Sequence, residues 1–225
     1  MVRPSSRRRA DHPRSRRVSP RKDIGMIVRL TKLGITGLIA VLAGVIATPC
    51  LAAGSSAYIA QIGDGNVGTV TQQGAVNARA DLRQAGGGNS GSIEQSGLGA
   101  MRARLAQVGS ANNGIVQQNG PADNEILLAQ TGSGNIARSR QTSTDATNFA
   151  ALTQTGANNV MALAQNGAGN NATLNQVGSG NAMTATQNGD GNQLSWTQIG
   201  SNLADMGIIQ SGGQAMKITQ TGAGK

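Results

Sequence analysis

The stretch at residues 154–198, QTGANNVMALAQNGAGNNATLNQVGSGNAMTATQNGDGNQLSWTQ, decides the fold because one spacing recurs throughout it. Glutamine returns every eleven residues, at Gln154, Gln165, Gln176, Gln187 and Gln198. The first four of these glutamines are followed by glycine two residues later and by asparagine five residues later. A unit of the form Gln-x-Gly-x-x-Asn that recurs in tandem at a fixed period indicates a repeat architecture.

The same spacing extends over residues 61–220. Before Gln154 the steps mostly alternate between eleven and twelve, so the period there is a pair of units about 23 residues long. The glutamines of the series are Gln61, Gln72, Gln84, Gln95, Gln107, Gln118, Gln130, Gln141, Gln154, Gln165, Gln176, Gln187, Gln198, Gln210 and Gln220. The asparagines are Asn66, Asn89, Asn112, Asn135, Asn159, Asn170, Asn181 and Asn192. Glycine supplies the positive φ that tight turns require, and the predicted turn glycines are Gly63, Gly74, Gly86, Gly109, Gly132, Gly156, Gly167, Gly178 and Gly189.

A second regularity has a period of two. The residue two positions before each glutamine is apolar in every unit except one, where it is Ser139. Eleven charged residues lie an odd number of positions before their glutamine: Arg79, Asp81, Arg83, Glu94, Arg102, Arg104, Glu125, Arg138, Arg140, Asp205 and Lys217. Because successive side chains of a β-strand face opposite sides, glutamines and aliphatic residues share one face and the charges take the other.

These two periods predict an all-β fold, a β-solenoid with two strands in each turn of 22–23 residues. The turns would stack at about 4.8 Å, in the cross-β manner of amyloid, and inward Gln and Asn would form ladders of amide hydrogen bonds. The motif persists to both ends of the repeats, near Gln61 and near Gln220, without a predicted capping helix. We therefore expect both ends of the stack to remain open to a second copy.

Residues 1–53 differ in composition from the repeats. Residues 1–25 are rich in arginine, which is typical of a basic disordered extension or of translation from a start codon placed too far upstream. We favour the second interpretation, because Met26 opens a segment with charged Arg29 and Lys32 followed by a short apolar stretch at 33–47. Residues 26–53 are predicted to be a secretory signal peptide, and 54–225 the repeat domain. The apolar stretch is too short for a stable membrane span.

The net charge of +9 belongs to the same N-terminal region. Eleven of the nineteen Lys and Arg residues precede Gly54, against two acidic residues, and the remaining eight basic residues are matched by eight acidic ones. The repeats therefore carry no excess charge, and no nucleic-acid partner is predicted. The single cysteine, Cys50, also lies in the predicted leader.

Residues 54–225 contain no His and no Cys, and their acidic residues are dispersed over turns and outer faces. No catalytic, cofactor-binding or metal-binding residues can be assigned, and the chain is predicted not to be an enzyme. An alternative function is that of a monomeric, secreted β-solenoid that binds ice or another surface. It would use a continuous row of outward threonines, and here residues such as Thr69, Thr173 and Thr197 are interrupted by charges and alanines.

The segments at 130–141 and 165–176 follow the pattern Gln-x-Gly-x-x-Asn-x-Ala-x-x-x-Gln, which resembles the curlin repeat. The resemblance covers essentially all of residues 55–225. The chain departs from the pattern where the alanine is replaced, as at Gly68 and Met161, and in having very few aromatic residues.

The resemblance implies a structural subunit of curli, the functional amyloid fibres (a class of pilus or fimbria) that support adhesion and biofilm matrix on bacterial surfaces. It further implies a homopolymer, a nucleator subunit, and export through the periplasm and an outer-membrane curli secretion pore with accessory factors. The regular units from Gln154 onward favour a major subunit. The charged, less regular region at 79–140 would suit a minor subunit or nucleator.

Overall fold

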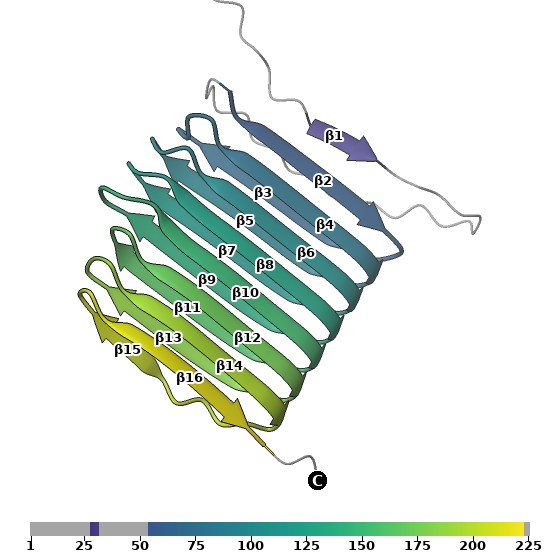
Figure 1. Cartoon of the computed structure of the whole chain (residues 1–225). Helices are drawn as coiled ribbons and strands as arrows, with labels where there is room; N and C mark the ends of the chain where they lie inside the picture. Colours follow the sequence, from purple (N-terminus) through teal and green to yellow (C-terminus); the bar gives the residue numbers. More distant parts are fainter. Residues whose placement is uncertain (1–27, 32–53, 223–225) are drawn as a thin grey trace, which may run out of the picture.

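The computed structural model describes residues 28–31 and 54–222, and the described chain is built from β-strands and turns without any helix (Figure 1). The strands lie in two sheets with all pairings parallel. Sheet A contains β1 (Val28–Thr31), β2 (Ser56–Ile62), β4 (Arg79–Gly87), β6 (Arg102–Ser110), β8 (Asn124–Ser133), β10 (Asn148–Ala157), β12 (Asn171–Ser179), β14 (Gln193–Ser201) and β16 (Ala215–Thr221). Sheet B contains β3 (Val67–Gln73), β5 (Ser90–Gly97), β7 (Asn113–Gly120), β9 (Ile136–Ser143), β11 (Val160–Gly167), β13 (Ala182–Asn188) and β15 (Ile208–Ser211).

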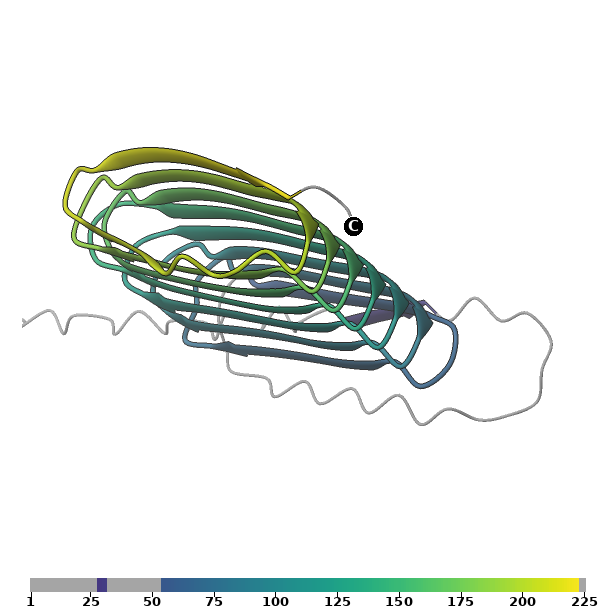
Figure 2. The same ribbon diagram turned by 90° about the horizontal axis from the view of Figure 1, so that it is seen from below.

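From β2 onward, successive strands alternate between the two sheets, so two strands and two bends complete one turn. Figure 2 shows these turns as flattened loops stacked on one another. Each strand pairs in register with the strand one turn away, and Gln154, for example, lies between Gln130 and Gln176. The predicted β-solenoid with about 23 residues per turn is therefore confirmed.

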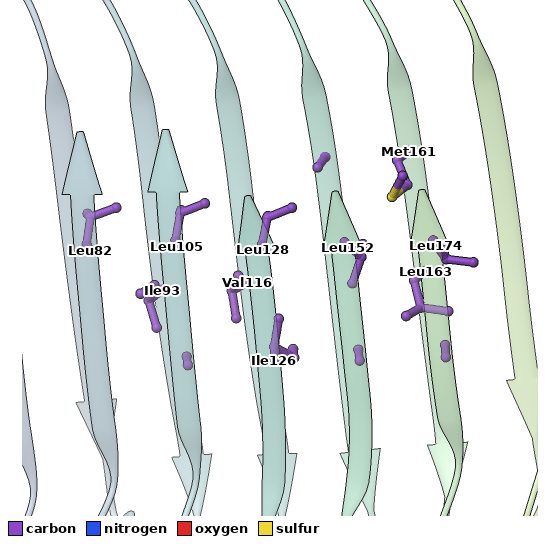
Figure 3. Close-up of a cluster of buried hydrophobic side chains, with 14 of the residues drawn as sticks. Leu82, Ile93, Leu105, Val116, Ile126, Leu128, Leu152, Met161, Leu163 and Leu174 are labelled. Atoms are coloured by element: carbon purple, nitrogen blue, oxygen red, sulfur yellow. The ribbon is translucent and has the colours of Figure 1, made fainter. Parts of the chain in front are cut away.

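The interior between the sheets is filled by the apolar columns (Figure 3). In sheet A, Leu82, Leu105, Leu128, Leu152 and Leu174 follow one another at the same register and are at most 2% exposed. The column continues to Trp196, which is fully buried. Ser139 interrupts the corresponding column of sheet B between Val116 and Leu163, and it is buried as well.

The bends rely on glycine at a left-handed backbone position. All nine predicted turn glycines have positive φ. At Gly132, where φ is 115°, an added Cβ would also overlap the carbonyl oxygen of Gly156 one turn further along. The close stacking of successive bends therefore excludes any larger residue there, in addition to the backbone preference.

The leader predicted at 26–53 lies outside the described residues, except for β1. This strand pairs with β2, with Val28 opposite Ala57 and Thr31 opposite Ala60. The expectation of an open N-terminal edge therefore needs a correction for the full chain, because β1 covers that part of β2.

Candidate functional site: amide ladders and the ends of the stack

The glutamine series forms two continuous hydrogen-bonded ladders, one inside each sheet. In sheet A, each Nε2 from Gln61 to Gln198 donates to the Oε1 of the next glutamine, at 2.6–2.9 Å. In sheet B, the same bond runs from Gln72 to Gln210 at 2.7–3.1 Å. Both ladders have one direction, so donation always runs toward the C-terminal end of the stack.

Each glutamine also links the two sheets. Gln130 Nε2 donates to the carbonyl oxygen of Asn113, the first residue of the preceding strand, at 3.0 Å. The equivalent bond is present at every glutamine of the series from Gln72 to Gln210. Both amide protons are therefore used within the interior, where an unpaired amide would be unfavourable.

The asparagines form ladders along both bends, with the opposite direction. Asn89 donates from its backbone N and from Nδ2 to Oδ1 of Asn66, each at 3.0 Å. The same backbone bond continues through Asn112, Asn135, Asn159 and Asn181 on one edge, and from Asn148 through Asn170 and Asn192 on the other. These bonds donate toward the N-terminal end of the stack.

Nearly all the predicted site residues lie inside. All eight predicted asparagines are buried, and so are thirteen of the fifteen glutamines. The two exceptions are Gln61 and Gln220, the first and last of the series, which are half-buried because no turn covers them on one side. The glutamine ladders are thus complete in the interior, whereas the asparagine ladder of the second edge begins only at Asn148, and the buried Asn124 Oδ1 before it has no hydrogen-bond partner among the described residues.

Sequence analysis missed two buried asparagines, Asn124 and Asn148. Asn148 Oδ1 accepts the backbone N–H of Asn170 at 2.9 Å, and Asn124 Nδ2 donates to Ser143 Oγ at 2.9 Å. Both follow longer bends, so they fall outside the spacing Gln-x-Gly-x-x-Asn. Their signal was their distance of six residues before the next glutamine, which the regular asparagines share.

The outward charges contact one another only locally. Arg102 Nη1 lies 3.6 Å from Glu125 Oε1 one turn along, and the two residues have the same offset from their glutamines. Arg104 is opposite Asp81 in register, but Asp81 pairs with Arg83 of its own strand at 2.8 Å. The hydrogen bond from Arg83 and the attraction of Asp81 raise the pKa of the Arg83 guanidinium above its ordinary value. Such exposed pairs contribute about 0–1 kcal/mol each, so the core and ladders dominate stability.

The two ends of the stack are chemically different. At the N-terminal end, Gln72 Oε1 is buried and accepts no hydrogen bond from the residues that the structure describes. At the C-terminal end, Gln210 and Gln220 are the last donors of their ladders, and their Nε2 groups bond to backbone oxygens of Gln193, Gln214 and Ala204. The N-terminal end therefore presents an unpaired amide acceptor, and the C-terminal end finishes in two glutamines whose Nε2 groups bond to backbone oxygens in place of a further glutamine.

Other kinds of site find no support in the described part of the chain. No three His, Cys, Asp or Glu side chains in it gather as a metal site would require. It also contains no helix long and apolar enough to cross a membrane.

Comparisons with known proteins give no relatives. No model of a known protein family matches the chain, and no curated protein or solved structure is significantly similar to it.

Proposed function

We propose that the repeat domain is a self-assembling structural subunit of an extracellular, curli-type amyloid fibre. Copies add end to end by continuing the stack, and the fibre serves adhesion and biofilm matrix. The proposal draws on the resemblance of residues 130–141 and 165–176 to the curlin repeat together with the predicted signal peptide. A nucleator subunit and a secretion pore with accessory factors are the partners that this function requires, and a major subunit is the role we favour.

The observation that carries the proposal is that residues 54–222 form no capping element at either end of the stack, although β1 pairs with β2 at the N-terminal end. A solenoid that remains monomeric needs terminal turns that block edge pairing. Here β16, the last strand of the described residues, is an ordinary repeat strand, and Ile218 packs on the core while only half-buried. At the opposite end, the buried Gln72 Oε1 lacks the donor that every later glutamine of its ladder has. A second copy supplies what each end lacks.

The alternative of an ice- or surface-binding monomer is less well supported. Thr173 lies on the outer face of sheet A, but its neighbours in register are Ala151 and Ser195, and the same column contains Asp81, Arg104 and Lys217. A regular binding row would need one residue type along the column.

The test compares a charge placed in the end surface with a charge placed beside it. We expect Ile218→Asp to slow fibre elongation at least tenfold, because an unpaired carboxylate would be buried when the next copy docks. Lys217→Asp, on the outer face of the same strand, should elongate at the normal rate. Residues 54–225 and both variants are followed by thioflavin T fluorescence with preformed seeds. Fibre diffraction then checks for the cross-β reflection at about 4.8 Å.

A soluble monomer at high concentration, with neither dye signal nor diffraction, would contradict the proposed function. Equal elongation rates of the two aspartate variants would instead show that the C-terminal end is not a growing end of the fibre. Far-UV circular dichroism of the soluble forms establishes that both variants remain folded.

A further inference from the structure

The fifteen strands from β2 to β16 make seven and a half turns, because the alternation begins and ends in sheet A. Without β1, sheet A has eight of these strands and sheet B has seven. At the C-terminal end, β16 therefore covers β14, while the edge of β15 has no strand beyond it in the described residues. The last half-turn makes the two sheets unequal in length.

Successive half-turns are nevertheless interchangeable in their bonding. Gln84 of sheet A donates to Val67 O in the strand before it, and Gln95 of sheet B donates to Arg79 O in the strand before it, at 3.0 and 3.3 Å. The same bond recurs at each of the thirteen glutamines from Gln72 to Gln210, whichever sheet holds them. One operation thus relates neighbouring strands: half a turn about the stack axis and an advance of half the turn spacing.

This equivalence allows two ways for a second copy to continue the stack. If the copy is only translated, its β2 covers β16 and its β3 covers β15, and sheet B then lacks one strand at the junction. If the copy is also rotated by half a turn, its β2 covers β15 and its β3 covers β16, and no strand is missing. A vacant strand position would leave backbone N–H and C=O groups unpaired beside the core, which is unfavourable.

We propose that successive copies stack head to tail with a rotation of half a turn, so that sheet A of each copy continues sheet B of the one before. This inference rests on the proposed function and specifies the geometry of its interface. In this arrangement Gln220 donates to Gln72 Oε1 of the next copy, and Gln210 exchanges its bond to Gln214 O for one to the next copy's Gln61 Oε1. The buried acceptor at Gln72 then gains its donor, and Gln61 Nε2 reaches Ala215 O of the preceding copy.

The chain ends are placed consistently with this geometry. β16 would be followed by a bend into sheet B, and in the rotated arrangement β2 of the next copy occupies that next strand position. The end of β16 in one copy therefore lies beside the start of β2 in the next, as consecutive strands of the repeat do within one copy. β1 lies on the edge of β2 that β15 of the preceding copy would cover. Removal of the segment containing β1 is thus required before this end can join a fibre.

The rotation can be measured, because a given outward residue lies on opposite sides of the fibre in successive copies. Seven and a half turns at about 4.8 Å give an axial advance of about 36 Å per copy. Thr131 is exposed on the outer face of β8, and Cys50 lies outside residues 54–225, so Thr131→Cys introduces a unique thiol for a gold label. Labels should alternate between the two sides of the fibre.

Two internal deletions in the region of strict eleven-residue spacing provide a matched pair. Deleting residues 165–175 removes one half-turn and joins Ala164 to Gln176, which leaves fourteen strands. Deleting residues 154–175 removes a complete turn and leaves thirteen. We expect labels on one side of the fibre for the half-turn deletion, and alternating labels for the full-turn deletion. Any gradual twist of the stack affects both deletions similarly and cannot produce this difference.

The experiment is electron cryomicroscopy of labelled fibres of residues 54–225 and of both deletions, with the unprocessed full chain in parallel. Alternating labels about 36 Å apart support the proposal. Extension of the full chain at its N-terminal end would overturn the part of it that requires removal of β1. Labels on one side in the undeleted fibre, or alternating labels after the half-turn deletion, overturn the rotation and leave the fibre function intact. Absence of fibres from residues 54–225 overturns both.

Discussion

The assignment of inner and outer faces can be tested with two neighbouring residues of β12, Leu174 and Thr173. Leu174 is 1% exposed and lies in register between Leu152 and Trp196. Thr173 faces solvent on the other side of the sheet. Replacing each by lysine introduces the same charge at positions one residue apart, so that only the facing differs.

The expected difference is large. Leu174→Lys forfeits about 1.5–3 kcal/mol of apolar burial. Holding an unpaired ammonium in the interior adds a penalty of several kcal/mol, even after local relaxation. Together these terms approach the whole stability of a typical domain, about 5–15 kcal/mol. Thr173→Lys should change the free energy of unfolding by less than about 0.5 kcal/mol, as at most exposed positions.

The assay is urea unfolding of residues 54–225 before assembly, followed through the fluorescence of Trp196, the only tryptophan. Because Trp196 stacks directly on Leu174, its emission should shift toward that of exposed indole in Leu174→Lys, even if distant turns remain folded. Unfolding midpoints that agree for the two lysine variants would refute the facing assignment. The same result would remove the basis for treating the glutamine series as interior.

Two further substitutions test the ladders and the bends. Gln154→Glu replaces a buried donor with a carboxylate facing Gln176 Oε1 and Ile136 O, so its folded-state pKa should lie above the ordinary value of about 4.3. Its unfolding free energy, measured against pH, should match the unsubstituted chain best below that value and fall as pH rises from it through the higher folded-state pKa, whereas exposed Gln193→Glu should show no such loss. Gly132→Ala should lower the unfolding midpoint much more than Gly169→Ala, because both have positive φ but an added Cβ at Gly169 meets no atom within 4 Å. Equal midpoints for the two alanine variants would contradict the close approach of Gly156 O.

The strands and their facing were predictable from sequence because two independent periods agree. The spacing of the glutamines locates the bends, and the odd or even offset of each residue from its glutamine gives its side of the sheet. The register follows as well, since identical motifs stacked in parallel align Gln130, Gln154 and Gln176. The spacing from the preceding glutamine does not locate the asparagine where the bend is longer, and Asn124 and Asn148 were therefore missed.

The choice of ion pairs was also beyond the sequence. Asp81 has Arg104 beside it one turn along and Arg83 two residues along its own strand, and both lie on the same outer face. Offsets in the repeat identify both neighbours, but only the side-chain geometry places Arg83 within 2.8 Å. The donor-to-acceptor directions of the amide ladders could not be predicted from the sequence for the same reason. They depend on which carbonyl oxygens, such as Asn113 O for Gln130, lie within reach of each amide.

Those directions bear on how copies can meet. If two copies met through their N-terminal ends, the amide oxygens of Gln61 and Gln72 would face the same acceptor groups of the neighbour. If they met through their C-terminal ends, the Nε2 groups of Gln210 and Gln220 would face the same donor groups. Each ladder would then lose a hydrogen bond at the junction, and each buried amide left unpaired costs about 1–3 kcal/mol. Head-to-tail addition instead matches donor to acceptor in both ladders at once. A shift of register by one residue would turn the glutamines of the added strand to the outer face and break the glutamine ladders at the junction, which fixes the register of each pairing.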